Sequence, residues 1–462
     1  MEESSLDPLF RLFRYSLEFL VLLLSSLPFL ATMQNQSLAP SPSASSRQQS
    51  VAALLPEEIV DHIFAQFGYD MMNAYWQDHV DGTNNLSNMS VIADGWTMPA
   101  RRLLFRKVAI WSWSHLQEEV EEGLGKLVRD FKIHGVYWDA VSSLEVAGAV
   151  FKLLKQLPNL RRLRLVAPHF DSFSSVDSAS MRAAVLLPHL HDLQVSDILS
   201  PHSLIVDLLE TSDHQISRLS VHSASARVAP HPVYKQIDFR GKLRFLSTGM
   251  AFYRSLVDPR LVAPEGLRGL GELQLQGIKR RSKEGGGGMY RVIAPTLSVL
   301  SINCDDVKWF AHFLPLFSNL SRLSLSPSHP HGEHDPTPLL LCLPPSLSAL
   351  RLRNDKQIVR SLARWTATPS LVPKGLKQIQ IDQIYDFETY QQLPPIPTLF
   401  TECRSDTISH LQRLSPGTLP FKTIKMWFWD NYLDQRSVVQ AECVRLGVTF
   451  HPEVVIDWDE ND

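Results

Sequence analysis

Cysteine is scarce in this sequence, and its scarcity limits the classes of protein that the chain can belong to. Among 462 residues there are four cysteines, widely separated and never at Cys-x-x-Cys spacing: Cys304, Cys342, Cys403 and Cys443. A secreted domain that is held together by disulfides has more cysteines, at closer spacing, than this chain. The pattern indicates reduced thiols in a cytosolic or nuclear protein.

Net charge is also nearly absent. The chain has 45 basic and 48 acidic residues, which leaves a formal net charge of −3. A general nucleic-acid binder needs a clear excess of positive charge to neutralise phosphates. We therefore expect no nucleic-acid partner.

The common enzyme motifs are missing as well. The sequence has no GxSxG elbow, HExxH pair, dinucleotide-binding glycine fingerprint, GxxxxGK phosphate loop or calcium loop. The expectation is a non-catalytic chain without a cofactor. Histidines, serines and aspartates are plentiful, so a dispersed catalytic set stays open.

The longest apolar run is short. It covers residues 19–31, is preceded by Arg11 and Arg14, and is interrupted by Ser25, Ser26 and Pro28. A basic flank before a short apolar stretch is typical of a signal peptide or anchor. A hydrophobic tail without a targeting role, or a true start at Met33, are the other interpretations. We expect a hydrophobic segment and a disordered leader over 1–50, and membrane association only if residues 1–32 act as a targeting segment.

Residues 51–112 carry three short amphipathic helical patterns. In LLPEEIVDHIFAQF (54–67), Pro56 suits a first helical turn and the apolar residues share one stripe: Ile59, Ile63, Phe64 and Phe67. The second pattern has Leu86, Met89, Ala93 and Trp96 on one face. The third starts at Pro99 and turns Leu103, Leu104 and Val108 inward. Such a small bundle has more large apolar residues than it can bury alone, so we expect it to dock on something.

The residues LPEEIVDHIF followed by NLSNMSVIADGWTMPARRLLFRKV resemble an F-box in its fungal form. The positions that match the family pattern are Leu55, Pro56, Ile59, Ile63, Phe64, Val91 and Trp96. The sequence departs from the pattern at residues 70–84, where the family has a shorter connection. The resemblance implies binding to a Skp-type adaptor through these seven residues, and through it to a cullin–RING ubiquitin ligase.

From residue 120 to 452 a different pattern repeats: an apolar residue, two others, then apolar-x-apolar. Copies begin at Val128, Leu160, Leu190, Ile216, Leu243, Leu270, Leu297, Leu320, Leu347 and Leu376, with steps between 23 and 30 residues from Leu160 onward, and a degenerate copy begins at Phe421. Alternate residues of a strand face the same side, so each copy predicts a short strand that turns its leucines inward. Stacked copies bury these leucines in one continuous core.

The copies resemble the long, irregular leucine-rich repeats common behind fungal F-boxes. They lack the asparagine or cysteine of the family's ladder position in most copies. The predicted fold class is therefore α/β: a three-helix F-box bundle followed by a solenoid of about ten to twelve repeats with a curved parallel sheet. A helix over 438–446, Gly447 and a strand over 448–450 are expected to cap its end, before an acidic tail at 453–462.

Three segments are candidate sites outside the F-box. The loop 329–334 contains His329, His331, Glu333 and His334, which could ligate a metal. The alternative interpretation is a flexible loop that binds no metal. The basic KRRSKEGGGG (279–288) suits either a nuclear-import signal or a solvated loop. The aromatic MWFWDNY (426–432) either lines the sheet surface for a partner or is buried under the cap.

These observations predict a non-catalytic substrate-recognition subunit. The F-box would bind the Skp-type adaptor, and the repeats would hold a protein substrate for ubiquitination. The sequence does not identify the substrate or the residues that bind it. The alternative is a leucine-rich-repeat scaffold or binding module without ubiquitin-ligase assembly, tethered to a membrane or not.

Overall fold

The computed structural model describes residues 106–110, 124–134, 149–166, 187–196, 201–222, 236–278, 287–304, 308–327, 337–352, 361–382 and 391–453, apart from residues 151, 363, 366, 392 and 429. The chain divides into two compact units, Met1–Lys107 and Val108–Asp462. The expected adaptor-binding residues Leu55, Pro56, Ile59, Ile63, Phe64, Val91 and Trp96 lie outside the described residues. The three-helix bundle and its contacts therefore stay predictions.

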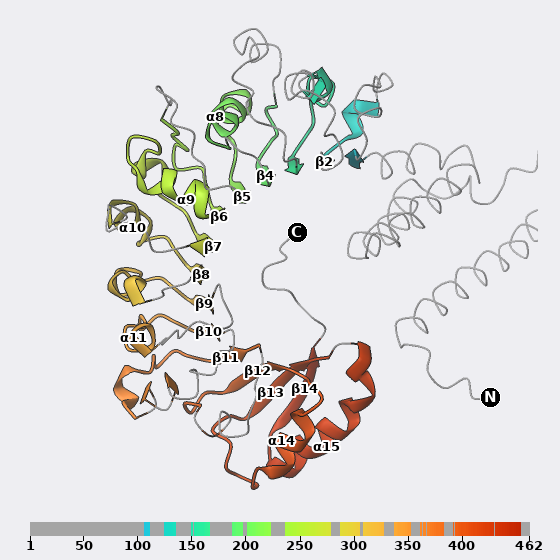
Figure 1. The fold of residues 1–462 in the computed structure, drawn as a ribbon, viewed down its shortest axis with the longest axis vertical. Coiled ribbons are helices and arrows are strands. Elements are labelled where there is room, and N and C mark those ends of the chain that lie inside the picture. Colours follow the sequence, from blue (N-terminus) through green and yellow to red (C-terminus); the bar gives the residue numbers. More distant parts are fainter. Residues whose placement is uncertain are drawn as a thin grey trace, which may run out of the picture. The chain divides into compact units, whose positions relative to one another are not determined.

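The second unit is built on one sheet in which each strand lies beside its neighbours in sequence order (Figure 1). The pairing from β2 to β14 is parallel throughout. The fourteen strands are β1 (Lys107–Ile110), β2 (Asp130–His134), β3 (Arg162–Val166), β4 (Asp192–Ser196), β5 (Arg218–His222), β6 (Phe245–Gly249), β7 (Glu272–Ile278), β8 (Val299–Cys304), β9 (Arg322–Pro327), β10 (Ala349–Leu352), β11 (Gln378–Ile381), β12 (Thr398–Glu402), β13 (Thr423–Trp427) and β14 (Thr449–Glu453).

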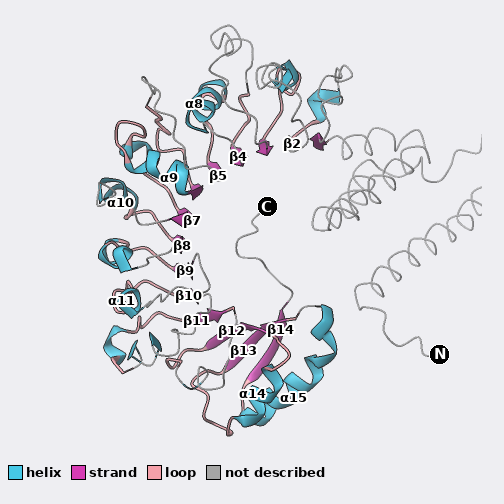
Figure 2. Ribbon diagram, in the orientation of Figure 1, coloured by secondary structure: helices cyan, strands magenta, loops and turns pink. Residues whose placement is uncertain are grey.

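Helical segments connect successive strands and cover one side of this sheet (Figure 2). The α-helices with described bounds are α8 (Pro201–Thr211), α9 (Met250–Val257), α10 (Gly287–Ile293), α11 (Thr337–Leu340), α14 (Thr407–Arg413) and α15 (Arg436–Leu446). Short 3-10 turns take their place elsewhere: η3 (Leu124–Leu127), η5 (Pro264–Leu267), η6 (Lys308–His312), η7 (Leu314–Leu316), η8 (Pro369–Leu371) and η9 (Asp430–Gln435). The unit is thus an α/β structure with the solenoid-like order that the repeated pattern predicted.

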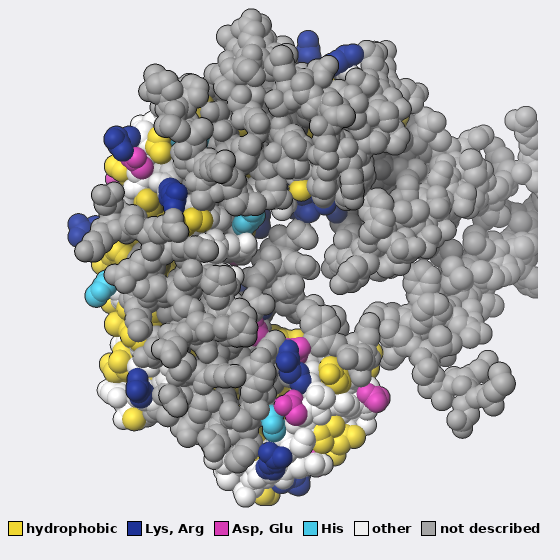
Figure 3. Space-filling view, in the orientation of Figure 1, with side chains coloured by type: hydrophobic (Ala, Val, Ile, Leu, Met, Phe, Trp, Pro, Cys, Tyr) yellow, Lys and Arg dark blue, Asp and Glu magenta, His cyan; other side chains and the backbone are white. Residues whose placement is uncertain are grey.

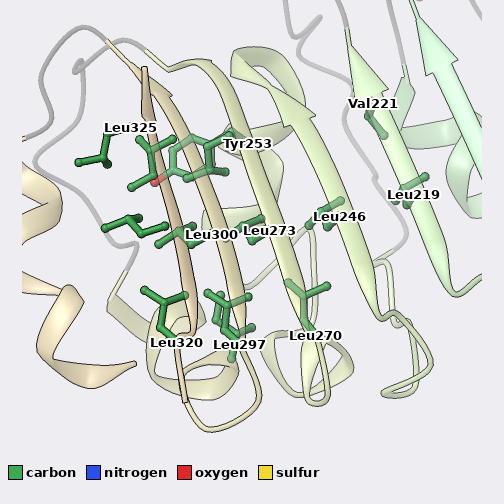
Figure 4. Packing of buried hydrophobic residues seen from close by; sticks show 14 of the residues in the cluster. Leu219, Val221, Leu246, Tyr253, Leu270, Leu273, Leu297, Leu300, Leu320 and Leu325 are labelled. Carbon is green, nitrogen blue, oxygen red and sulfur yellow. The ribbon is translucent and has the colours of Figure 1, made fainter. Parts of the chain in front are cut away.

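The core lies between the sheet and these helical segments, and the repeated leucines fill it. Leu160, Leu163 and Leu165 are at most 1% exposed, and the equivalent residues of later strands are buried in the same way. Figure 4 shows one tier with Leu270, Leu297 and Leu320 and a second with Leu246, Leu273 and Leu300. Each buried leucine contributes roughly 1.5–3 kcal/mol relative to exposure. Because neighbouring strands share their register, each tier is continuous across the sheet.

Serine hydroxyls link the turns that precede several strands. Ser298 Oγ donates to the carbonyl of Gly271 at 3.0 Å, Ser321 Oγ to that of Ser298 at 3.0 Å, and Ser348 Oγ to that of Ser321 at 2.9 Å. Each serine occupies the position after the first apolar residue of its copy, and each acceptor is the equivalent residue one copy earlier. We name Ser298, Ser321 and Ser348 the serine ladder. These hydrogen bonds link successive turns in copies that have no asparagine or cysteine at the ladder position.

Two strands were not expected from the sequence. β12 lies between the copies that begin at Leu376 and Phe421. Its inward residues Leu399 and Thr401, and Ile396 just before it, are at most 3% exposed. β1 includes Lys107 and Val108, which the sequence placed at the end of a helix. That helix prediction is wrong at its end, because these residues add a strand to the edge of the sheet.

The last segment has the expected form. Helix α15 ends at Leu446, and Gly447 follows with φ 78°, in the left-handed conformation that glycine adopts without steric cost. The Val448 N–H then donates to the Cys443 carbonyl at 3.0 Å, which satisfies one of the last helical carbonyls. Strand β14 follows and pairs with β13, so the helix and strand together close this end.

Candidate functional site

The face of the sheet opposite the leucine core differs from strand to strand in how far it is open. On β3, β4 and β5, buried residues alternate with partly exposed ones, so this face is accessible. On β6 all five residues are buried, and on β12 the last four are. Strands β8 and β9 alternate in the same way, but β3–β5 carry more charged side chains on this side. We therefore take the non-core side of β3–β5 as the candidate partner-binding surface and name it the β3–β5 face. Its residues are Arg162, Arg164, Val166, Asp192, Gln194, Ser196, Arg218, Ser220 and His222.

Charge alternates along the first row of this face. Register places Arg162 beside Asp192, and Asp192 beside Arg218. The Arg162 Nε lies 2.9 Å from Asp192 Oδ2, and the Arg218 Nε lies 3.8 Å from the same oxygen. One carboxylate is thus shared by two guanidinium groups. The side chains of Arg162 and Arg218 stay 26% and 34% exposed, so both remain partly accessible to solvent.

Two side chains of β6 extend the face on the side next to β5. The Arg218 guanidinium carbon lies 4.2 Å from the ring centroid of Phe245 in β6, within range of a cation–π contact. The Ser247 hydroxyl lies 3.1 Å from His222 Nε2. These contacts hold the arginine and the histidine in place beside the closed strand β6.

The strand before the face adds further charge. Asp130 of β2 is the register partner of Arg162, and Lys132 is the partner of Arg164. Over β2–β5 the non-core side therefore carries the cations Lys132, Arg162, Arg164 and Arg218 against the carboxylates Asp130 and Asp192. A local positive excess thus lies on a chain whose net charge is −3. Figure 3 shows basic side chains in this region of the surface.

The equivalent side of β10 and β11 carries a closed polar cluster. The Arg351 Nε lies 3.1 Å from Asp382 Oδ1, and both side chains are less than 15% exposed. The Gln380 amide donates to the same carboxylate at 3.1 Å, while its own Oε1 is buried without a hydrogen-bond partner. Lys425 of β13 and Glu453 of β14 form a separate pair at 2.6 Å, in which the lysine side chain is 38% exposed. This cluster consists of groups that bind one another, so it is a poorer surface for a partner than the β3–β5 face.

The aromatic segment 426–432 lies beside this cluster, and its residues Met426, Trp427 and Phe428 are buried. Met426 points into the core with 0% exposure, and Trp427 is 8% exposed on the other side of β13. The Trp427 ring packs edge-on against Phe400, with centroids 4.9 Å apart, and Phe428 packs edge-on against Phe450 at 6.1 Å. Of the two interpretations, burial is therefore right for Trp427 and Phe428.

Two thiols, those of Cys403 and Cys443, lie near the last strands and are buried. Burial is the main cause that raises the pKa of Cys403 to about 11, and the nearby carboxylates of Glu402, Asp406 and Asp434 add to it. Burial likewise raises the pKa of Cys443 to about 12. Since a thiolate is the nucleophilic form of cysteine, neither thiol is placed to act as a nucleophile at neutral pH.

Several predicted segments lie outside the described residues. The His-rich loop 329–334 is among them, and of the basic segment 279–288 only Gly287 and Gly288 are described, at the start of α10. Where the chain is described, no group of three or more histidine, cysteine, aspartate and glutamate side chains could hold a metal ion. Within the same stretches, every helix is too short or too polar to cross a membrane.

The sequence did not single out the β3–β5 face, although a signal for it was available. Aligning the copies places Asp130, Arg162, Asp192 and Arg218 at one position, just before the second apolar residue. Alternating charge in that column indicates neighbouring side chains on one face. Comparison with known proteins finds no family whose sequence profile matches this chain and no curated protein that matches it.

Proposed function

We propose that the chain is a non-catalytic substrate-recognition adaptor for ubiquitination. In this proposal residues 51–112 form an F-box that binds a Skp-type adaptor, and residues 120–452 form a leucine-rich-repeat solenoid that holds a protein substrate. The observation that carries the recognition role is the open β3–β5 face, which offers a row of partly exposed charged side chains on a sheet whose other side is packed.

The adaptor half of the proposal is supported by sequence. Leu55, Pro56, Ile59, Ile63, Phe64, Val91 and Trp96 match the F-box pattern in the right order. Some of these residues would form the bundle's own core and others would contact the adaptor. The adaptor would in turn connect the chain to a cullin–RING ligase.

The physical advantage of such an arrangement is effective concentration. A substrate held on the sheet stays within reach of the ubiquitin-loaded enzyme bound to the same assembly. Linking two binding sites in this way replaces a bimolecular encounter by an intramolecular one, at millimolar-scale effective concentration for short connections. The chain then needs no catalytic residue of its own.

Capture of a purified Skp-type adaptor by the full chain tests the proposal. We expect the wild-type chain to bind and the double variant Ile59→Asp, Ile63→Asp to lose binding, because two carboxylates would replace apolar contacts in the first helix. Val444→Asp is the matched control, since Val444 is 70% exposed on α15 and accepts a carboxylate without burial. This control should bind as the wild type does.

Two results contradict the ubiquitin-ligase role: no capture by the wild-type chain, or full capture by the double variant. A chain that folds but captures no adaptor would fit the alternative, a leucine-rich-repeat scaffold or binding module without ubiquitin-ligase assembly. Comparing ubiquitin-enriched proteins from cells with and without the chain would then identify substrates if adaptor binding holds.

A further inference from the structure

The turns that lead into β2–β7 form one continuous edge of the sheet. They comprise residues 124–129, 155–161, 187–191, 212–217, 236–244 and 264–271. Each later turn is hydrogen-bonded to the previous one: the Arg161 N–H donates to the Arg129 carbonyl at 2.7 Å, and the Arg244 N–H to the Ser217 carbonyl at 2.8 Å. The equivalent bonds donated by His191, Ser217 and Gly271 are 2.8–3.0 Å long. Side chains from six copies are therefore held along one edge.

Basic residues outnumber acidic ones on this edge. The six turns contain eight lysines and arginines against three carboxylates, those of Asp213, Asp238 and Glu265. We name the eight cations the basic rim: Lys126, Arg129, Lys155, Arg161, Arg240, Lys242, Arg244 and Arg268.

The strand residues next to the basic rim do not cancel its charge. The first outward residues of β2–β7 add the cations Arg162 and Arg218 and the carboxylates Asp130, Asp192 and Glu272. The edge then holds ten cations against six carboxylates, so a positive excess is left.

Contacts within the chain also leave most of this charge in place. Arg129 Nη1 donates to the Asn159 carbonyl at 3.1 Å and Arg244 Nη1 to the Gly269 carbonyl at 2.8 Å, and a neutral carbonyl does not remove a guanidinium's charge. Arg268 pairs with the carboxylate of Glu265. In the part of the chain that the structure describes, the other five side chains are exposed and make no hydrogen bond or ion pair: Lys126, Lys155, Arg161, Arg240 and Lys242.

The edge changes character beyond β7. The turns 294–298, 314–321 and 341–348, which carry the serine ladder, contain no charged residue. They separate the basic rim from Lys374, Lys377 and Lys422 in the turns before β11 and β13. The positive excess is therefore local, although the whole chain has a net charge of −3, and an anionic partner gains most at the turns before β2–β7.

Length and chemistry favour an acidic peptide as that partner. Five strand intervals separate the turn before β2 from the turn before β7, about 24 Å, which about seven residues of an extended chain span. A single-stranded nucleic acid binds through aromatic side chains on which its bases stack, and the one aromatic in the described turns, Phe239, is 1% exposed. Carboxylates need only hydrogen-bond donors with positive charge, which lysine and arginine supply.

We propose that the basic rim binds an acidic segment of a partner protein, at least about seven residues long and rich in aspartate or glutamate. The rim borders the β3–β5 face, because its turns lead into those strands. As a statement about the ubiquitination substrate, this rests on the proposed function. As a statement about binding, it depends only on the rim.

Fluorescence anisotropy with the purified full chain, without any adaptor, tests the proposal. The probe is a labelled peptide of about twelve residues in which glutamate alternates with serine, long enough to cover the rim. The same peptide with glutamine in place of glutamate, and a labelled oligouridylate of equal charge, are the comparison probes. We expect at least about tenfold tighter binding of the glutamate peptide than of the glutamine peptide at about 0.01 M salt, and weaker binding at about 0.15 M, because ions screen exposed charges.

Variants locate the binding on the sheet edge. We expect Arg161→Gln with Arg240→Gln and Lys242→Gln to weaken binding of the glutamate peptide at least about fivefold. The matched control is Lys374→Gln with Lys377→Gln and Lys422→Gln, which removes the same charge from exposed positions in turns beyond the serine ladder and should change binding less than about twofold. Arg161→Lys with Arg240→Lys and Lys242→Arg keeps the charge and should keep the binding. If urea unfolding shows that the first triple variant does not fold, Arg161→Gln with Lys242→Gln decides, with an expected loss of at least about threefold.

Equal binding of the glutamate and glutamine peptides would overturn the proposal. So would full binding by the folded rim variant, a loss in the control as large as in the rim variant, or tighter binding of oligouridylate than of the glutamate peptide. Markedly tighter binding by a chain that ends after residue 453 would show that the chain's own acidic tail occupies the rim, and would also overturn it. Since no Skp-type adaptor takes part, a failure here leaves adaptor capture untouched, and a failure of adaptor capture leaves the peptide result untouched.

Discussion

At the scale of single residues, the buried thiols show how burial controls reactivity. Cys403 and Cys443 are both 0% exposed, and burial raises the pKa of each thiol because it disfavours the charged thiolate. With a pKa of about 11, only about one Cys403 in a thousand is a thiolate at pH 8. Cys342, by contrast, is partly exposed.

We therefore expect iodoacetamide to modify Cys342 well before Cys403 or Cys443 in the folded chain. Raising the pH should increase the rate at Cys403 up to about pH 11, since deprotonation is still incomplete below that value. Mass spectrometry of peptides after timed alkylation measures each site, and alkylation in urea provides the unfolded control. Rapid modification of Cys403 at pH 8 in the folded chain would contradict this account.

The residue scale also shows what sequence reveals and what it does not. The buried leucines were predictable because a strand that packs on one side leaves apolar residues at fixed offsets, as at Leu160, Leu163 and Leu165. Outward residues follow no such rule, so the leucine pattern did not place Arg162 and Arg218 beside Asp192; only an alignment of the copies, with its alternating charge at one position, indicates that these side chains are neighbours. The burial of Trp427 depended on Phe400 in the neighbouring strand, which pattern alone did not place beside it.

At the scale of elements, the serine ladder ties successive turns together independently of the sheet. Ser298, Ser321 and Ser348 each donate to the turn one copy earlier, and all three are partly buried. A hydrogen bond of this kind contributes about 0.5–1.5 kcal/mol net. Because the donors are side chains, they can be removed without changing the backbone pairing of β8, β9 and β10.

We expect Ser298→Ala, Ser321→Ala and Ser348→Ala each to lower the free energy of unfolding by about 1 kcal/mol, and the triple variant by about 2–4 kcal/mol. The matched control is Ser318→Ala, an exposed serine in the turn before β9. Urea unfolding followed by circular dichroism gives the comparison. If the triple variant unfolds at the same urea concentration as the control, the ladder has no stabilising role.

Element boundaries were predictable where the pattern was regular. The capping helix and its glycine were expected because Gly447 follows a helical pattern and precedes an alternating one. Strand β12 was missed because Thr401 replaces the last apolar residue of its copy, and because Ile396 follows Leu376 by only 20 residues. Strand β1 was missed because its four residues are too few to show alternation against a helical pattern.

At the scale of the whole second unit, the C-terminal helix and strand protect an edge. Strand β14 pairs with β13, and α15 buries Val439, Cys443 and Leu446 against the core. Without them, β13 would present unpaired N–H and C=O groups and exposed apolar residues. Such an edge is a template for pairing with another chain.

Ending the chain after residue 435 should therefore lower stability by several kcal/mol, on the order of 5, because four buried side chains lose their packing: Val439, Cys443, Leu446 and Val448. We also expect the truncated chain to self-associate. Size-exclusion chromatography with light scattering measures this, and a chain ending after residue 453, which loses only the tail, is the control. A truncated chain that stays monomeric and as stable as the control would show that the cap is dispensable.

The overall α/β order was predictable because apolar positions recur through most of the second unit. The expected number of copies, ten to twelve, fell short of the fourteen strands, since β1, β12 and β14 carry the pattern weakly. Which part of the sheet is open was not predictable, because the closure of β6 and β12 depends on side chains and connections from several strands at once.

The sequential strand order has a mechanical consequence. Among the strands that the structure describes, each is hydrogen-bonded to the strands before and after it in sequence and to no other, so tension applied to the two ends of the sheet loads the end strands first. Detaching one strand does not release any distant one, and the sheet would unzip step by step from an end. With copies 23 to 30 residues apart, each step would lengthen the chain by about 80–100 Å.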